Sequence, residues 1–309
     1  MKPNMIISRG SITKWIAGCL ALSLACLSSA FADDLTPRPT IGEILRLDPG
    51  ADALLAPDAR IEVLASGLDW SEGPVWIPKA DRRPGGGGYV VFSDVPQNQV
   101  MKWKEGEGLS VFLKPSGYTG LGEYSPEPGS NGLNVNSRGE LISCEHGDRR
   151  ISVLTRGGGK RTLADNFEGK RFNSPNDCTL EKAGNIYFTD PPYGLPKGPE
   201  DTETREISWN GIYKITPSGQ VSLMTKEMTY PNGLTLSPDE KMLYVAQSDP
   251  KAAIWKAFPI QTDGALGASR ILADVTAMVS AQSSMKPSSM WNSRSVLNTR
   301  PLDSTGTVA

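Results

Sequence analysis

Four segments of this chain begin alike and end alike, and this repetition constrains the fold more than any single residue does. Each opens on a polar residue with a side-chain oxygen, continues through an alternating apolar run and a turn, and closes on a second β-rich run. Repeats of about 40–50 residues that hold several short strands predict a β-propeller. The openings are Glu72 (EGPVWIP), Asn131 (NGLNVNSRGELISCE), Asn176 (NDCTLEKAGNIYFTD) and Asn232 (NGLTLSPDEKMLYVAQ), which lie 59, 45 and 56 residues apart.

The stretch from residue 60 to residue 279 favours an all-β fold throughout. Short runs rich in β-branched and aromatic residues alternate with Gly, Pro, Asn and Asp, beginning with the strand candidate IEVLASG after Arg60. No stretch has a 3.6-residue period long enough to predict a helix. We therefore predict a propeller domain over 60–279, with about four blades recognisable, preceded by an extended leader at 33–59.

Residues 1–32 have the pattern of an export signal. A basic start without acids leads into an apolar run at 15–27 and a small-x-small sequence at 30–32. The apolar run is too short to span a bilayer comfortably. The pattern therefore predicts cleavage and a periplasmic or secreted protein. A lipoprotein cleavage box at 16–19 is the alternative, although no apolar stretch precedes it.

Charge and cysteine content exclude several classes of function. Without residues 1–32 the chain carries 29 basic and 34 acidic residues, net −5, with no basic stripe. Nucleic acid is therefore excluded as a partner, and no membrane association is expected after cleavage. An export compartment permits a disulfide between Cys144 and Cys178, but two small buried thiols in strands are the favoured interpretation. The chain has no C-x-x-C and no His/Cys cluster, so no zinc or redox motif is predicted.

Equivalent positions of successive blades face one central axis in a propeller, so the four opening residues should converge on a single site. Glu72, Asn131, Asn176 and Asn232 together offer one carboxylate and three amide oxygens. Hard divalent cations such as Ca²⁺ and Mg²⁺ bind oxygen ligands of this type, with waters completing the shell. Any single Asn-Gly pair can be explained as a turn former, but recurrence at one repeat position favours an axial site.

A cation at this site could polarise an ester or lactone carbonyl while a nearby carboxylate removes a proton from water. Candidate carboxylates are Asp94, Glu145 and Asp190 at the ends of the second β-rich runs, and Asp177 beside the third opening. We take Asp190 as the candidate for proton transfer; the alternative is that these acids are solvated or bind neighbouring backbone amides. His146 is the only histidine, and no G-x-S-x-G accompanies it. We predict a rim or turn position for His146, with substrate contact as the alternative.

At these residues the chain resembles the gluconolactonase, senescence-marker-protein and regucalcin family of six-bladed propellers. The matching stretches are SEGPVW, RFNSPND and YPNGL, while ISCEHGDRR and IYFTDPPYG resemble the bacterial gluconolactonase branch. The resemblance implies hydrolysis of a sugar lactone to the aldonic acid with a divalent ion on the axis. Ca²⁺ is the favoured ion, with Mg²⁺, Mn²⁺ or Zn²⁺ as alternatives. It also implies that Glu72 and Asn232 ligate the metal and that Asn176 contacts the metal or the substrate. Asn131 is assigned to substrate binding by the repeat alone.

The C-terminal part departs from the family pattern. The family's remaining ligand is an aspartate in a Pro-Asp-Gly motif, which does not occur after Asn232. From Ser280 the repeat pattern stops, and residues 280–309 form a serine-rich tail without alternation. We therefore predict a truncated or frame-altered C-terminus, with the last blades missing or degenerate. A non-catalytic metal- or sugar-binding propeller is the alternative to a hydrolase.

Overall fold

The structure is a computed structural model that describes residues 37–46, 48–78 and 87–285. The described residues form two units, divided between Leu64 and Ala65. The predicted export signal at 1–32 and the tail from 286 onward lie outside the described residues. Within the described part, no helix has the length and apolar content needed to cross a membrane.

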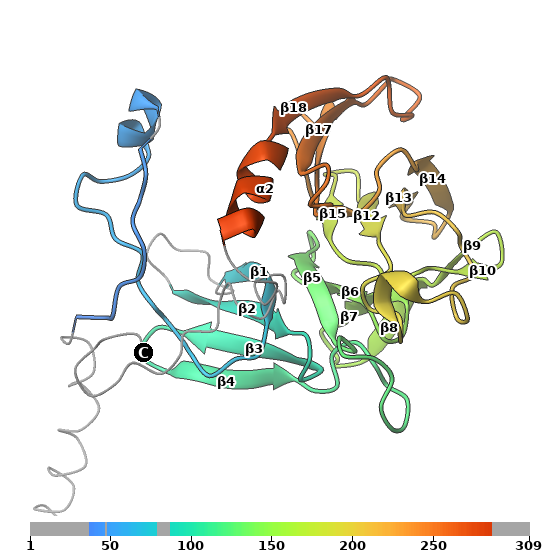
Figure 1. The fold of residues 1–309 in the computed structure, drawn as a ribbon. Helices are drawn as coiled ribbons and strands as arrows, with labels where there is room; N and C mark the ends of the chain where they lie inside the picture. Colours follow the sequence, from blue (N-terminus) through green and yellow to red (C-terminus); the bar gives the residue numbers. More distant parts are fainter. Residues whose placement is uncertain (1–36, 47, 79–86, 286–309) are drawn as a thin grey trace, which may run out of the picture. The chain divides into compact units, whose positions relative to one another are not determined.

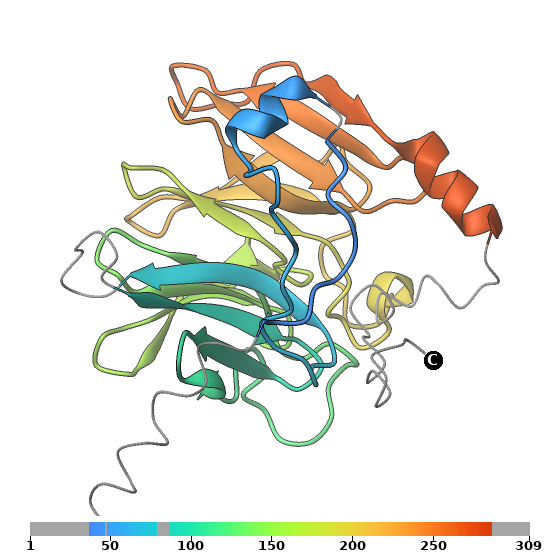
Figure 2. The same ribbon diagram turned by 90° about the vertical axis from the view of Figure 1, so that its left-hand side faces the viewer.

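The second unit contains four antiparallel sheets of four strands each, and in every sheet the strand order follows the chain. We call them blades 1 to 4. In Figure 1 the blades follow one another in chain order, and in Figure 2 blade 4 (orange) lies uppermost while blades 1 (teal) and 2 (green) overlap below it. The propeller class predicted from the repeats is confirmed, and the four recognisable repeats are the four blades.

Each blade begins one or two residues before or after a repeat opening and contains short strands joined mostly by tight turns. The bounds are β1 Ser71–Pro78, β2 Gly88–Asp94, β3 Gln99–Lys104 and β4 Gly108–Leu113 in blade 1; β5 Ser130–Val135, β6 Leu141–Glu145, β7 Arg150–Leu154 and β8 Lys160–Ala164 in blade 2; β11 Cys178–Leu180, β12 Ile186–Asp190, β13 Gly211–Ile215 and β14 Val221–Thr225 in blade 3; β15 Pro231–Leu236, β16 Met242–Gln247, β17 Ile254–Pro259 and β18 Arg270–Asp274 in blade 4. A two-stranded ribbon, β9 Asn166–Phe167 and β10 Lys170–Arg171, links blades 2 and 3.

The largest apolar cluster belongs to blades 2 and 3. Ile142 and Ile151 of blade 2 belong with Phe188 of blade 3 to one group of buried side chains. Burial of this much apolar surface is the main force that holds neighbouring blades together. Cys144 and Cys178 belong to the same cluster, and both are buried and unpaired. This agrees with the interpretation of two buried thiols.

Two local predictions were wrong. The strand candidate after Arg60 forms only an isolated bridge between Thr40 and Glu62, because the facing segment carries prolines that have no N–H for a ladder. The chain also forms an α-helix, α2 (Thr276–Met285), so the unpatterned tail expected from residue 280 begins inside a helix. The start of α2 is stabilised by Asp274, whose Oδ1 accepts a hydrogen bond from the Thr276 N–H at 2.9 Å.

The described residues of the leader are largely irregular. They include one short 3₁₀ helix, η1 (Pro49–Ala53), which Asp48 caps through a hydrogen bond from the Gly50 N–H. A second, η2 (Gly198–Glu200), lies in the polar loop between β12 and β13.

Candidate functional site

The predicted site residues lie at backbone irregularities where the innermost strands begin. The pairing of β1 with β2 shifts register after Glu72, and the pairings of the first two strands in blades 2 and 4 shift at the same place, around Asn131 and Asn232. A β-bulge of this kind turns a side chain out of the regular alternation of a strand. The repeat therefore has a structural meaning: in three blades a register shift begins at or directly before the opening residue.

Successive inner strands approach so closely at this level that glycine is required. The Gly132 N–H donates to the Asn176 carbonyl at 2.7 Å. A Cβ on Gly132 would lie 2.5 Å from Asp177 Oδ1, and one on Gly73 would lie 2.3 Å from the Asn131 carbonyl oxygen. Since β1 contacts β5, β5 contacts β11 and β11 contacts β15, the four opening segments meet in turn around the inner ends of the blades.

Two carboxylates interact at these inner ends. Asp177 accepts hydrogen bonds from the Cys178 N–H at 2.8 Å and from the Leu234 N–H of blade 4 at 3.3 Å. Burial raises the pKa of Asp177 to about 6, and the negative charge of Glu72 adds to the rise. Burial also raises the pKa of Glu72, against a 3.1 Å hydrogen bond from Trp70 Nε1 to its Oε1. Concentrated negative charge of this kind favours a bound cation.

The amide groups of Asn176 and Asn232 each lie beside a polar side chain. Asn176 Nδ2 lies 3.5 Å from His146 Nε2, while its Oδ1 is buried with no hydrogen-bond partner among the described residues. Asn232 Nδ2 donates to Ser248 Oγ at 3.3 Å, and that hydroxyl is 2.5 Å from Tyr193 Oη. A buried, unsatisfied oxygen is costly, and a divalent cation would satisfy it.

The remaining opening residue, Asn131, is buried, with 6% of its surface exposed. In the described part of the chain no three His, Cys, Asp or Glu residues are grouped so as to hold a metal ion. The predicted donor set, one carboxylate and several amide oxygens, does not require such a group. Trp70, Tyr193 and Ser248 were missed because none of them occupies a repeat opening.

His146 lies in the turn directly after β6, which fits the turn half of the rim-or-turn prediction, but its side chain lies in the interior and not at a rim. Its side chain has no exposed surface, and its Nδ1 lies 3.7 Å from Glu127 Oε2. The ring is covered by Gly194, where a Cβ would lie 2.3 Å from the His146 Cβ. Burial lowers the pKa of the imidazole to about 4, so the ring is neutral at ordinary pH. Because the side chain has no accessible surface, His146 cannot touch a substrate and can act only through its neighbours.

Asp190 also lies in the interior. Its Oδ2 accepts from the Asn173 N–H at 2.8 Å, just ahead of the inner strand of blade 3. Equivalent hydrogen bonds occur in two other blades. Asp94 in blade 1 accepts from the Trp70 N–H, and Gln247 in blade 4 accepts from the Thr229 N–H. The last residue of each of these second strands thus holds the loop that enters the inner strand. This geometry favours the interpretation that Asp190 binds neighbouring backbone amides, rather than the prediction that it transfers a proton.

Replacing Asp190 with Asn tests this interpretation through the pH dependence of stability. Burial raises the pKa of Asp190 from 3.8 to about 7, and its Oδ1 has no hydrogen-bond partner among the described residues. Between pH 4 and 7 the folded state therefore holds a proton that the unfolded state has lost, so wild-type stability falls as pH rises through this window. Asp190→Asn keeps an acceptor for Asn173 and stays neutral.

We expect Asp190→Asn to be more stable than the wild type by about 2 kcal/mol at pH 8, with the difference fading toward pH 4. Urea unfolding at pH 4.5 and pH 8 measures this. A variant that is less stable at pH 8 contradicts the structural role. Turnover of lactone that disappears in this folded variant would instead identify Asp190 as the proton acceptor.

Comparisons with known proteins agree with the propeller. Residues 70–287 match a family model described as "SMP-30/Gluconolactonase/LRE-like region". A gluconolactonase from Zymomonas mobilis is 41% identical over 240 residues, which cover 76% of this chain and 64% of that protein. A lactonohydrolase from Aspergillus oryzae is 34% identical over 98 residues, 31% of this chain and 22% of that protein. A solved gluconolactonase structure from Xanthomonas campestris superposes with a TM-score of 0.63 at 32% identity, covering 77% of this chain and 75% of that one. The chain thus spans less than two thirds of the length of the curated relatives it matches.

Proposed function

The chain belongs to the SMP-30/gluconolactonase/LRE-like family, and we propose that it hydrolyses a sugar lactone to the aldonic acid. The reaction uses a divalent cation, for which Ca²⁺ is the favoured candidate. The observation that carries the proposal is the Asn176 amide, whose buried oxygen lacks a partner in the described structure and adjoins the segment that holds Asp177. Relatives named gluconolactonase and lactonohydrolase support the choice of reaction.

The proposed roles follow from the chemistry of each group. Glu72, Asn176 and Asn232 hold the cation through oxygen atoms, and Asn131 orients the lactone. When bound, the cation polarises the lactone carbonyl toward attack by water. Asp177, the carboxylate that interacts with Glu72, accepts the proton of the attacking water.

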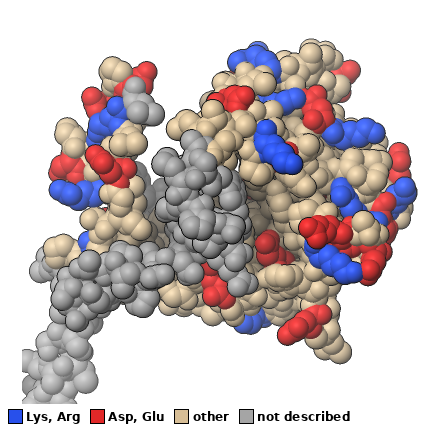
Figure 3. Space-filling view, in the orientation of Figure 1, with Lys and Arg blue, Asp and Glu red and all other residues tan. Residues whose placement is uncertain are grey.

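The charge distribution supports a small, weakly charged substrate. On the face shown in Figure 3, Lys and Arg are interspersed with Asp and Glu, and the coloured surface shows no continuous basic stripe. A polyanion such as nucleic acid requires such a stripe. A sugar lactone carries no charge and needs none.

Lactone hydrolysis followed in a pH-stat tests the proposal. With D-glucono-δ-lactone we expect acid release above the spontaneous rate when Ca²⁺ is present, loss of this excess with a chelator, and recovery after Ca²⁺ is restored. Turnover that resists the chelator contradicts the metal requirement. Calcium binding without turnover supports the non-catalytic binding propeller instead.

A further inference from the structure

We propose that His146 is a positioning residue that holds the Asn176 amide with its nitrogen toward the protein interior and its oxygen toward the cation site. The inference rests on the proposed function only for the identity of the ligand. The orientation of the amide is a property of the chain itself.

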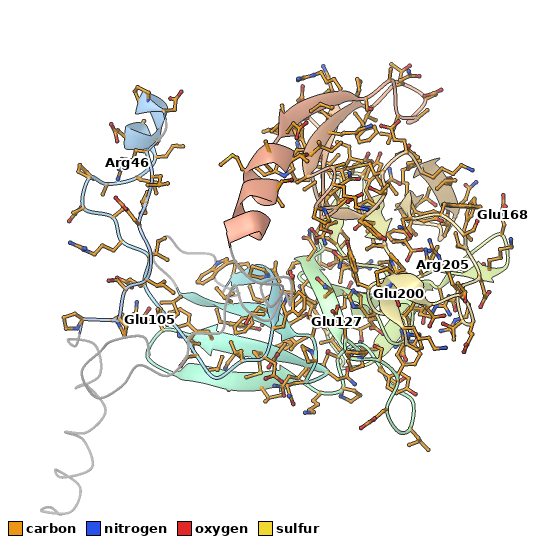
Figure 4. All side chains as sticks on the ribbon, in the orientation of Figure 1. Arg46, Glu105, Glu127, Glu168, Glu200 and Arg205 are labelled. Atoms are coloured by element: carbon orange, nitrogen blue, oxygen red, sulfur yellow. The ribbon has the colours of Figure 1, made fainter. Side chains whose placement is uncertain are left out.

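On its Nδ1 side the His146 ring faces Glu127. The ring nitrogen Nδ1 lies 3.7 Å from the carboxylate of Glu127, a residue of the loop that leads into β5 (Figure 4). At this distance the two groups form no hydrogen bond among the described residues. A carboxylate accepts hydrogen bonds and does not donate them, so the ring proton belongs on Nδ1, the nitrogen that faces it.

On its Nε2 side the ring faces the Asn176 amide. In a neutral imidazole with its proton on Nδ1, Nε2 carries a lone pair and can only accept. The group 3.5 Å away must therefore be the NH₂ of Asn176 and not its oxygen. A flipped amide would bring two acceptors together and leave two N–H groups at the position of the buried, unpartnered Oδ1.

The loop after β12 covers the ring. Gly194 packs on the imidazole, with space for no side chain: a Cβ would lie 2.4 Å from His146 Cγ and 2.8 Å from Nδ1. The Gly194 N–H donates to Ser174 Oγ at 2.9 Å, and Ser174 Oγ donates to the Pro191 carbonyl at 2.6 Å. The loop after β12 therefore clamps the ring in one plane. Residues behind a ligand that fix its orientation typically change metal affinity by 10–100-fold when they are replaced.

Paired substitutions at His146 test the role, because the two nitrogens can be replaced separately. The terminal amide of Gln reaches the position of Nε2, whereas that of Asn reaches only the position of Nδ1. By calorimetric titration with Ca²⁺ we expect His146→Gln to bind within about threefold of the wild type. His146→Asn should bind about tenfold more weakly or worse. Equal losses in two variants that both remain folded overturn the proposal, since a merely structural role predicts them.

A spectroscopic measurement decides the case without any variant. His146 is the only histidine, so a long-range ¹⁵N–¹H spectrum of the full chain reports its tautomer without assignment. We expect a neutral ring with the proton on Nδ1, and a proton on Nε2 or a charged ring near pH 7 overturns the inference. If the wild type takes up no Ca²⁺, the metal part of the proposed function fails, while the tautomer still decides the orientation of the Asn176 amide.

Discussion

Replacing Glu72 with Gln is expected to lower lactone hydrolysis by about 100-fold or more while leaving the fold intact. Replacing a residue that only supports a metal ligand lowers metal affinity or activity 10–100-fold. Removing the charge of a ligand itself should therefore lower activity by at least the upper end of that range. Gln keeps an acceptor for the 3.1 Å hydrogen bond from Trp70 Nε1. Steady-state rates and Ca²⁺ titration of the variant measure the effect.

The stability of the same variant without Ca²⁺ should not fall with its activity. Burial raises the pKa of Glu72, which means that the cation-free protein holds this charge at a cost. The Glu72→Gln protein should therefore melt no lower than the wild type without Ca²⁺, and it should lose the rise in melting temperature that Ca²⁺ causes. Glu107→Gln is the matched control, because Glu107 lies in the turn between β3 and β4, ion-paired with Lys102 at 3.1 Å. Equal activity of Glu72→Gln and Glu107→Gln would remove Glu72 from the site.

Replacing Gly132 with Ala is expected to cause the largest loss of stability. The added Cβ would lie 2.5 Å from Asp177 Oδ1, 2.7 Å from the Asn176 carbonyl oxygen and 2.7 Å from Asp177 Cα. Two of these atoms belong to the backbone of the neighbouring blade, so relief requires the blades to separate. Overpacking of this kind costs about 3 kcal/mol, and it should also weaken Ca²⁺ binding by moving Asn176.

The matched control is Gly157→Ala, in the turn after β7, where the nearest atom to an added Cβ is Thr155 Oγ1 at 3.9 Å. Thermal and urea unfolding of both variants should show a near-neutral effect at Gly157 and a large loss at Gly132. Similar midpoints for the two variants would mean that blades 2 and 3 do not approach as closely as described.

The blades could be predicted from the sequence because their signals are local. Alternating apolar residues and turn residues recur with the repeat, and each of the four openings marks the start of an inner strand. Glu72, Asn131 and Asn232 lie at or beside the register shifts of their blades, as their common repeat position leads one to expect. Helix α2 was missed because its sequence, TAMVSAQSSM, has almost no apolar face; the available signal was Asp274 two residues before it.

The interior positions of His146 and Asp190 could not be predicted, because non-local packing determines them. His146 follows a strand end, where a polar residue is normally exposed, but the loop after β12 brings Gly194 over its ring. Asp190 closes a strand in the same way, and the segment before β11 returns to place the Asn173 N–H on its carboxylate. The His146 contact joins a turn of blade 2 to a loop of blade 3, which no pattern within one repeat records. The Asp190 contact depends on backbone that lies outside the strands, whose position the strand pattern does not predict.

Anomalous diffraction from crystals of the protein soaked in Mn²⁺ and then in Ca²⁺ tests the central claim most directly. We predict one cation at the inner ends of the blades, bound through the Glu72 carboxylate and the Asn176 and Asn232 amide oxygens, with Ca²⁺–oxygen distances of about 2.3–2.6 Å. A cation bound elsewhere, or a structure in which these three side chains cannot reach a common ion, would contradict the account.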